Sequence, residues 1–207
     1  MSIVEKKPAI KETVGAQYTC FNTPNEDGEW TEEFETEVEK TKVVKSVKVT
    51  ENSDAADAYA SGEIYDSHSI VNTVSIEVEV IAFPDATIAK MKGDLVDDGG
   101  LIRSGGNRNK PYFAYGKVVK FKGGKVRFDW YPKCKLVENT DQADTSEDKF
   151  KEQTDTIKIT AYPYNEDGDI VARVTSDINM PEGLTEAKFF SKPILTPEDL
   201  ATVVSGS

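Results

Sequence analysis

Residues 112–137 constrain the fold most strongly, because they have the pattern of a two-stranded β-hairpin. At the centre lies a Gly123-Gly124 pair, which tolerates the positive φ angles of a type I′ turn. After the turn, apolar side chains alternate with charged ones. The apolar set is Val126, Phe128, Trp130, Cys134 and Leu136, and the charged set is Lys125, Arg127, Asp129, Lys133 and Lys135. This period of two predicts an outgoing strand that is half-buried.

The turn also predicts a register for the hairpin. A two-residue turn places Phe121 opposite Val126 and Lys120 opposite Arg127. Like charges that face each other across two strands destabilise the pair. We therefore expect the polar face of the hairpin to meet something acidic, either in this chain or in a partner.

Length and composition are those of a globular chain with one main domain. The chain has 207 residues, of which 38% are hydrophobic and 30% charged. It contains neither a run of eighteen apolar residues nor an apolar signal-peptide core near the start, so we expect a protein that is made in a cytoplasm and does not enter a membrane. Cys20 and Cys134 are too few for a disulfide framework or a zinc site, and we interpret both as small buried residues.

The charge of the chain is unevenly distributed. The net charge of −12 argues against a protein that grips phosphate backbones. Residues 26–39 carry eight acidic residues and no basic one, whereas residues 103–135 carry ten basic residues and only Asp129 as an acid. Two interpretations stay open: two solvated faces, or copies of the protein that pair acid to base in an assembly.

The remaining pattern predicts a mostly β chain with one dependable helix. We expect strands at 17–21, 42–50, 69–82, 154–162 and 170–174, a short helix at 86–92 and a helix that starts at Thr196-Pro197. Residues 1–14 form an N-terminal arm, 15–180 a single β-rich domain and 181–207 a C-terminal extension. Within the domain we expect a long loop at 22–41, which carries Trp30 and Phe34 among its acids, and a second, acidic loop at 138–153.

Catalytic and metal-binding patterns do not emerge from the sequence. His68 is the single histidine and has the pattern of a polar turn residue. Residues 100–105 have the glycine spacing of a phosphate loop, but Gly106-Asn107 stands where Lys and Ser or Thr are required. Asp97-Asp98 lacks the alternating oxygen ligands of a calcium loop. We therefore expect no enzyme, no cofactor and no metal site.

Four motifs and their order carry a resemblance to a known family. They are Ala55-Ala56-Asp57-Ala58-Tyr59, Phe83-Pro84-Asp85-Ala86-Thr87-Ile88-Ala89, Pro111-Tyr112-Phe113-Ala114-Tyr115-Gly116 and Arg127-Phe128-Asp129-Trp130-Tyr131-Pro132-Lys133-Cys134. Over residues 15–165 the chain resembles the major tail protein family of long, non-contractile-tailed bacteriophages. The acidic loop at 138–153 and the long tail of the chain depart from a compact version of that family.

The resemblance implies a mainly β subunit, an antiparallel β-barrel or sandwich with one short flanking helix and long loops. It implies hexameric rings that stack into the tail tube and conduct DNA during ejection, in a virion that also holds tape-measure and tail-completion proteins. An acidic lumen that repels phosphates suits such a conduit, because DNA must pass without tight binding. By position, the contacts between rings fall to residues 22–40, 1–14 and the stretch after Met180.

The two charged regions supply the candidate contact residues between subunits. The acidic loop contributes Trp30, Glu33, Phe34, Glu35 and Glu37, and the basic hairpin contributes Lys120, Arg127, Lys133 and Lys135. Two other functions compete with an assembling tail protein. A monomeric β-sandwich that binds a surface or a carbohydrate predicts an exposed aromatic platform. A nucleic-acid binder that uses the basic region predicts DNA affinity that falls steeply with salt.

Overall fold

The computed structural model describes residues 5, 7–60, 63–106, 108–142, 145 and 154–206, and for residues 54–60 and 63–70 it describes the backbone alone. The side chain of His68, the first residues of the predicted arm and most of the predicted loop at 138–153 lie outside the described part. The strands are β1 (Lys11–Phe21), β2 (Glu39–Thr41), β3 (Val44–Ala60), β4 (Glu63–Val80), β5 (Leu95–Val96), β6 (Ile102–Arg103), β7 (Phe113–Phe121), β8 (Val126–Thr140), β9 (Asp155–Ala161) and β10 (Ala172–Thr175). The helices are α1 (Asp85–Lys92), α2 (Glu186–Phe189) and α3 (Pro197–Ser205).

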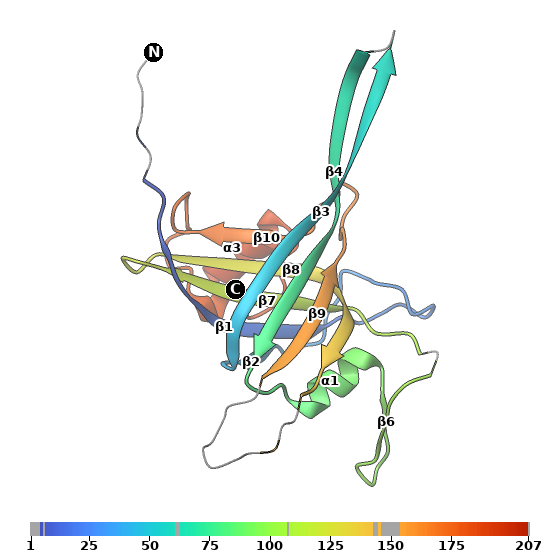
Figure 1. The fold of residues 1–207 in the computed structure, drawn as a ribbon. Helices are drawn as coiled ribbons and strands as arrows, with labels where there is room; N and C mark the ends of the chain where they lie inside the picture. Colours follow the sequence, from blue (N-terminus) through green and yellow to red (C-terminus); the bar gives the residue numbers. More distant parts are fainter. Residues whose placement is uncertain are drawn as a thin grey trace.

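The fold is mainly β and antiparallel, as predicted, and it resembles a sandwich more than a barrel. The main sheet has the order β2-β1-β7-β8-β9-β4-β3, and β10 pairs with β8. No pairing joins the two ends of this path among the described residues, so the sheet stays open. Strand β8 belongs to both layers, because its first half pairs with β10 and its second half with β9. Figure 1 shows β3, β4 and β9 crossing over β1 and β7.

Two hydrophobic cores lie on opposite faces of the layer formed by β1, β7 and the first half of β8. The first core fills the space between this layer and β4 and β9, and it includes Tyr115, Tyr131, Ile76 and Ile157. The second core lies on the other face, where the C-terminal segment covers the sheet. Its members are Ala16, Tyr18, Cys20, Ala114, Val118, Phe128, Trp130, Leu184, Phe189, Phe190, Ile194 and Val203. Both cysteines are free and buried, as predicted.

The predicted hairpin is present, but its predicted register is wrong by one residue. Lys120 pairs with Val126, and Arg127 pairs with Val119 instead of Lys120. The turn contains three residues rather than two, since the Phe121 N–H donates to the Lys125 carbonyl, and Gly123 and Gly124 both have positive φ. The extra turn residue removes the predicted clash of like charges. It places Lys117 opposite Asp129.

The prediction of a half-buried outgoing strand holds for residues 133–136, where buried and partly exposed side chains alternate, but it is wrong for residues 128–132, where both faces are covered. In β8, residues 128–132 are all buried, and Asp129 is fully inaccessible. The second core covers one face, while the first core and a group of basic side chains cover the other. A pattern of alternating charge therefore marks a buried ion-pair cluster here, not a solvated face.

Helices α1 and α3 form where short-range sequence signals predict them. Helix α1 ends at Gly93, which has φ 70°, and it buries Ala89 and Met91. Helix α3 begins with a capping box, in which the Thr196 side chain accepts from Asp199 N and the Asp199 carboxylate accepts from Thr196 N. Helix α2, at the side of the sheet, was not predicted.

The ends of the chain contribute more to the fold than the sequence suggests. Strand β1 begins at Lys11, so residues 11–14 of the predicted arm pair with β7 of the same chain. At the other end, the Phe190 ring stacks on Tyr18 with 3.9 Å between ring centroids, and the Trp130 indole N–H donates to the Phe189 carbonyl. The predicted C-terminal extension thus supplies apolar side chains to the second core.

Candidate functional site

A two-stranded ribbon projects from the body of the protein. It comprises residues 53–60 of β3 and 63–72 of β4, and Figure 1 shows it extending away from every other element. Within β4, the residues that pair with β9 start at Val74, so no described strand forms a third strand beside the projecting ribbon. Eight paired residues per strand correspond to a length of about 26 Å. We call this element the projecting ribbon.

Both edges of the projecting ribbon are open among the described residues. Where β3 lies against the body, its outer edge likewise has no strand partner in the described part of the chain. A two-stranded hairpin alone is marginally stable in water, and open edges are templates for pairing with another chain. The projecting ribbon is therefore a candidate surface for contact with a second protein molecule.

A second projection carries exposed apolar side chains. The short hairpin of β5 and β6 exposes Leu95, Val96, Leu101 and Ile102, with relative exposures between 43% and 62%. Arg103 closes this hairpin through an ion pair with Asp97, at 2.8 Å between Nη2 and Oδ1. Contiguous exposed apolar residues of this kind are typical of interaction surfaces.

The predicted acidic loop is held against its own chain. Phe34 forms an isolated β-bridge with Asn22 and packs against the second core, so its ring is partly buried. The Asn22 side-chain amide donates to the carbonyls of Thr31 and Glu33, at 2.8 Å and 2.7 Å. The Glu35 carboxylate pairs with Lys90 of α1 at 2.6 Å.

The predicted basic residues Lys133 and Lys135 lie over aromatic rings of the same chain. The Lys133 ammonium is 4.8 Å from the centroid of Trp30, and the Lys135 ammonium is 4.1 Å from the centroid of Tyr112. Burial lowers the pKa of Lys133, and the nearby charge of Lys135 lowers it further. The basic hairpin thus meets the acidic loop within one subunit through the Trp30 ring, rather than through a carboxylate.

The other predicted contact residues are dispersed. Lys120 and Glu37 are exposed, whereas Arg127 is turned inward, with 3.2 Å between its Nε and the Asp129 Oδ2. The structure brings Trp30 and Lys133 together but does not gather the nine residues into one patch. Pairing of acidic and basic surfaces between copies stays a prediction.

The comparisons with known proteins add little. No protein-family model matches the chain, and no curated protein matches it. Among solved structures, the chain is similar to a chain in the cryo-EM structure of the anti-feeding prophage (AFP) baseplate, 6-fold symmetrised. The TM-score is 0.43 and the identity 10%, over 82% of this chain and 97% of that chain. This likeness is too distant to carry an argument about function.

Several other kinds of site find no support in the part of the chain that the structure describes. It holds no group of three or more His, Cys, Asp or Glu side chains placed to bind a metal ion. None of its helices is long and apolar enough to cross a membrane. None of its exposed large apolar side chains is aromatic, although a carbohydrate-binding platform requires exposed aromatic rings.

Proposed function

We propose that the chain is a structural protein of a bacteriophage tail, whose copies assemble into stacked, hexameric rings that form the tail tube. In this proposal the protein resides in the virion and assembles in the host cytoplasm, its partners are further copies of itself with tape-measure and tail-completion proteins, and DNA passes through without tight binding. The sequence resemblance over residues 15–165 supports the family, and the net charge of −12 suits a DNA conduit.

The observation that carries the proposal is the projecting ribbon. A ribbon with two open edges and no third strand gains stability when a neighbouring subunit covers it. A protrusion on one part of a subunit that docks on a different part of the next subunit makes a head-to-tail contact. Head-to-tail contacts generate closed rings or open helical filaments, which are the geometries of a tube.

Deletion of the projecting ribbon tests this role. Asn52 and Thr73 are register partners, so an Asn-Gly turn in place of residues 53–72 joins β3 to β4 and leaves the pairing of β4 with β9 intact. We expect this variant to fold as a monomer and to lose the ability to form large assemblies, as measured by sedimentation velocity against the intact chain. The control variant Lys122→Gln changes an exposed turn residue of the β7–β8 hairpin and should assemble normally.

The outcome is decided by the sedimentation profile of the folded variant. Near-intact circular dichroism and melting temperature establish that the body of the protein has folded. If the shortened chain then assembles to the same extent as the intact chain, the ribbon does not make the contact and the proposal loses its main support.

A further inference from the structure

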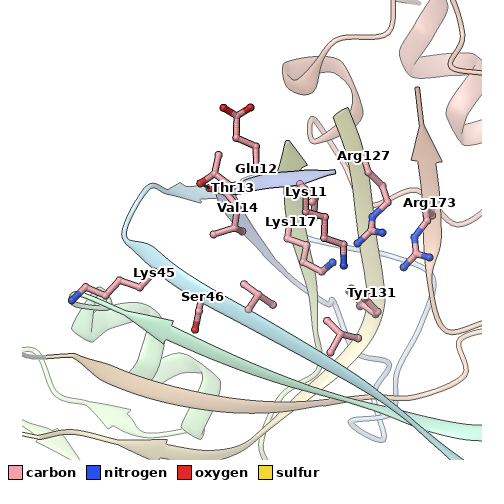
Figure 2. Close-up of a pocket in the computed structure, with 13 residues that line it drawn as sticks. Lys11, Glu12, Thr13, Val14, Lys45, Ser46, Lys117, Arg127, Tyr131 and Arg173 are labelled. Atoms are coloured by element: carbon pink, nitrogen blue, oxygen red, sulfur yellow. Dashed lines mark hydrogen bonds between the residues drawn. The ribbon is translucent and has the colours of Figure 1, made fainter. Parts of the chain in front are cut away.

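A basic cavity of about 330 Å³ opens between the two layers of strands (Figure 2). It is lined by the start of β1, by β3, and by β7, β8 and β10 on the opposite side. Its charged lining residues are Lys11, Lys45, Lys117, Arg127 and Arg173, against the single acid Glu12. Val14, Val47, Val49 and Val119 supply apolar walls. A positive cavity is unexpected in a chain with a net charge of −12.

Asp129 lies beside this cavity and binds three cations at once. Its Oδ2 atom is 2.5 Å from the Lys117 ammonium and 3.2 Å from the Arg127 Nε, and its Oδ1 atom is 2.6 Å from the Arg173 Nε. The Asp129 side chain is fully buried and that of Lys117 is 4% exposed. The three cations lie on neighbouring strands of one layer. Lys117 comes from β7, Arg127 from β8 and Arg173 from β10.

The charges in this cluster do not balance. One carboxylate faces three cationic side chains, and both carboxylate oxygens are already in use. The Arg127 Nε is buried without a well-aligned hydrogen bond. Burial lowers the pKa of Lys117 despite the attraction of Asp129, so the surroundings of the ammonium group are poorly solvated. Arg173 is partly exposed to solvent, but uncompensated positive charge at the buried Lys117 and the mostly buried Arg127 is unfavourable unless a counter-ion is present.

We propose that the basic cavity is a binding site for a compact oxyanion, a carboxylate or a phosphate. Both arginines contact Asp129 through Nε, and Figure 2 shows their guanidinium groups and the Lys117 ammonium gathered on one side of the cavity, near Tyr131. A guanidinium group binds two oxygens of a carboxylate or phosphate with good geometry. An anion in the basic cavity supplies the additional negative charge that Asp129 alone does not provide.

The dimensions of the cavity favour a small ligand. A volume of about 330 Å³ is at the lower end of ligand pockets, which run from roughly 300 to 1,000 Å³. It admits a phosphate ion or one acidic side chain with its apolar stem against the valines. The anion therefore has two sources: free phosphate in solution, or a carboxylate from a second copy of the chain. The site itself does not depend on the proposed tail function.

Calorimetric titration of the full-length protein with inorganic phosphate tests the site. We expect saturable binding to the intact chain, and binding weaker by about tenfold or more in Arg173→Gln, because one charged hydrogen-bonding group is lost. Arg173 is suited to this change, since its side chain is 41% exposed and the Lys117–Asp129 pair survives its removal. Lys125→Gln is the matched control, because it removes an exposed lysine of the same hairpin that pairs with Asp177.

Sedimentation in the presence of phosphate distinguishes the two sources. If phosphate saturates the site and also dissolves assemblies of the intact chain, the natural ligand is a carboxylate of a second copy. If phosphate saturates the site and assembly is unaffected, the ligand is a free anion. Absence of saturable binding, or equal affinity of the intact chain and a folded Arg173→Gln variant, overturns the proposal.

Discussion

At the scale of single residues, the burial of the Asp129 carboxylate requires compensation by several positive charges. It is a fully buried carboxylate whose charge is compensated by Lys117, Arg127 and Arg173. Burial alone raises the pKa of Asp129, but the charge and hydrogen bond of Lys117 and the charges of the two arginines outweigh it, so the pKa lies below its ordinary value. The carboxylate therefore stays ionised and stabilises the folded state.

We predict that Asp129→Asn destabilises the protein by about 3–5 kcal/mol at neutral pH, because the buried Lys117, the mostly buried Arg127 and the partly exposed Arg173 lose their common counter-charge. Lys117→Met is the comparison, and we expect it to cost less than about 1 kcal/mol, since Asp129 keeps two guanidinium partners. Urea unfolding at pH 7 measures both differences in the free energy of unfolding.

The pH dependence gives a second readout of the same group. Because the folded pKa is depressed, the stabilisation by Asp129 is fully present above about pH 4 and is lost as the pH falls through the folded pKa. The difference in the free energy of unfolding between wild type and Asp129→Asn should therefore become smaller below about pH 4. A difference that stays constant down to pH 2 would contradict the assignment.

The sequence around Asp129 also shows that charge alternation does not reveal whether the polar face of a strand is exposed. The period of two in β8 correctly predicted the strand, and Phe128 and Trp130 do lie on one buried face. However, a single strand cannot reveal what covers its other face. The turn length, which decides whether Lys117 or Val118 lies opposite Asp129, depends on one residue in a Gly-rich loop.

At the scale of elements, the docking of the C-terminal segment on the sheet depends on close approach at Gly116. A Cβ atom at this position in β7 would lie 2.7 Å from Cε1 of Phe190 and 3.0 Å from Cε3 of Trp130. Both rings are buried in the second core, where Phe190 also stacks on Tyr18. Side chains in such a core cannot move aside without strain.

We predict that Gly116→Ala destabilises the protein by about 1–3 kcal/mol, because the added methyl group overpacks this interface. Gly99→Ala is the control, because a Cβ atom there meets nothing within 4 Å and its φ is not in the left-handed region. Chemical unfolding of the two variants measures the effect. Equal stability of both would show that the C-terminal segment is not tightly docked.

Element prediction from sequence succeeded where the signal is local. The Pro-Asp start of α1, its Gly93 end and the capping box of α3 are short-range features. The outer half of the β3–β4 ribbon was missed, because its Ala-, Asp- and Ser-rich sequence has low β-propensity. Helix α2 was missed because four residues carry too little periodicity, and Phe189 and the following Phe190 are fixed by tertiary packing on β8 and β1.

At the scale of the whole molecule, three features lack a pairing strand, a covering surface or a counter-charge within the described part of the chain. The projecting ribbon has open edges, the β5–β6 hairpin exposes apolar side chains, and the basic cavity has excess positive charge. We expect a partner or a ligand to stabilise each of these features. The sequence does not predict the projecting ribbon as a contact surface. Charge and aromatic content point to the nine candidate residues, whereas the open edges of the ribbon become visible only from the strand pairing in the structure.

Negative-stain electron microscopy of the concentrated, full-length protein, with sedimentation velocity in parallel, tests the central claim most directly. The claim is that copies of this chain assemble through contacts that repeat around a ring. We predict rings or hollow tubes of uniform diameter, with a sedimenting species much larger than the 22.8 kDa chain. A monomer that persists at every concentration and in the presence of preformed tail tips would contradict the claim.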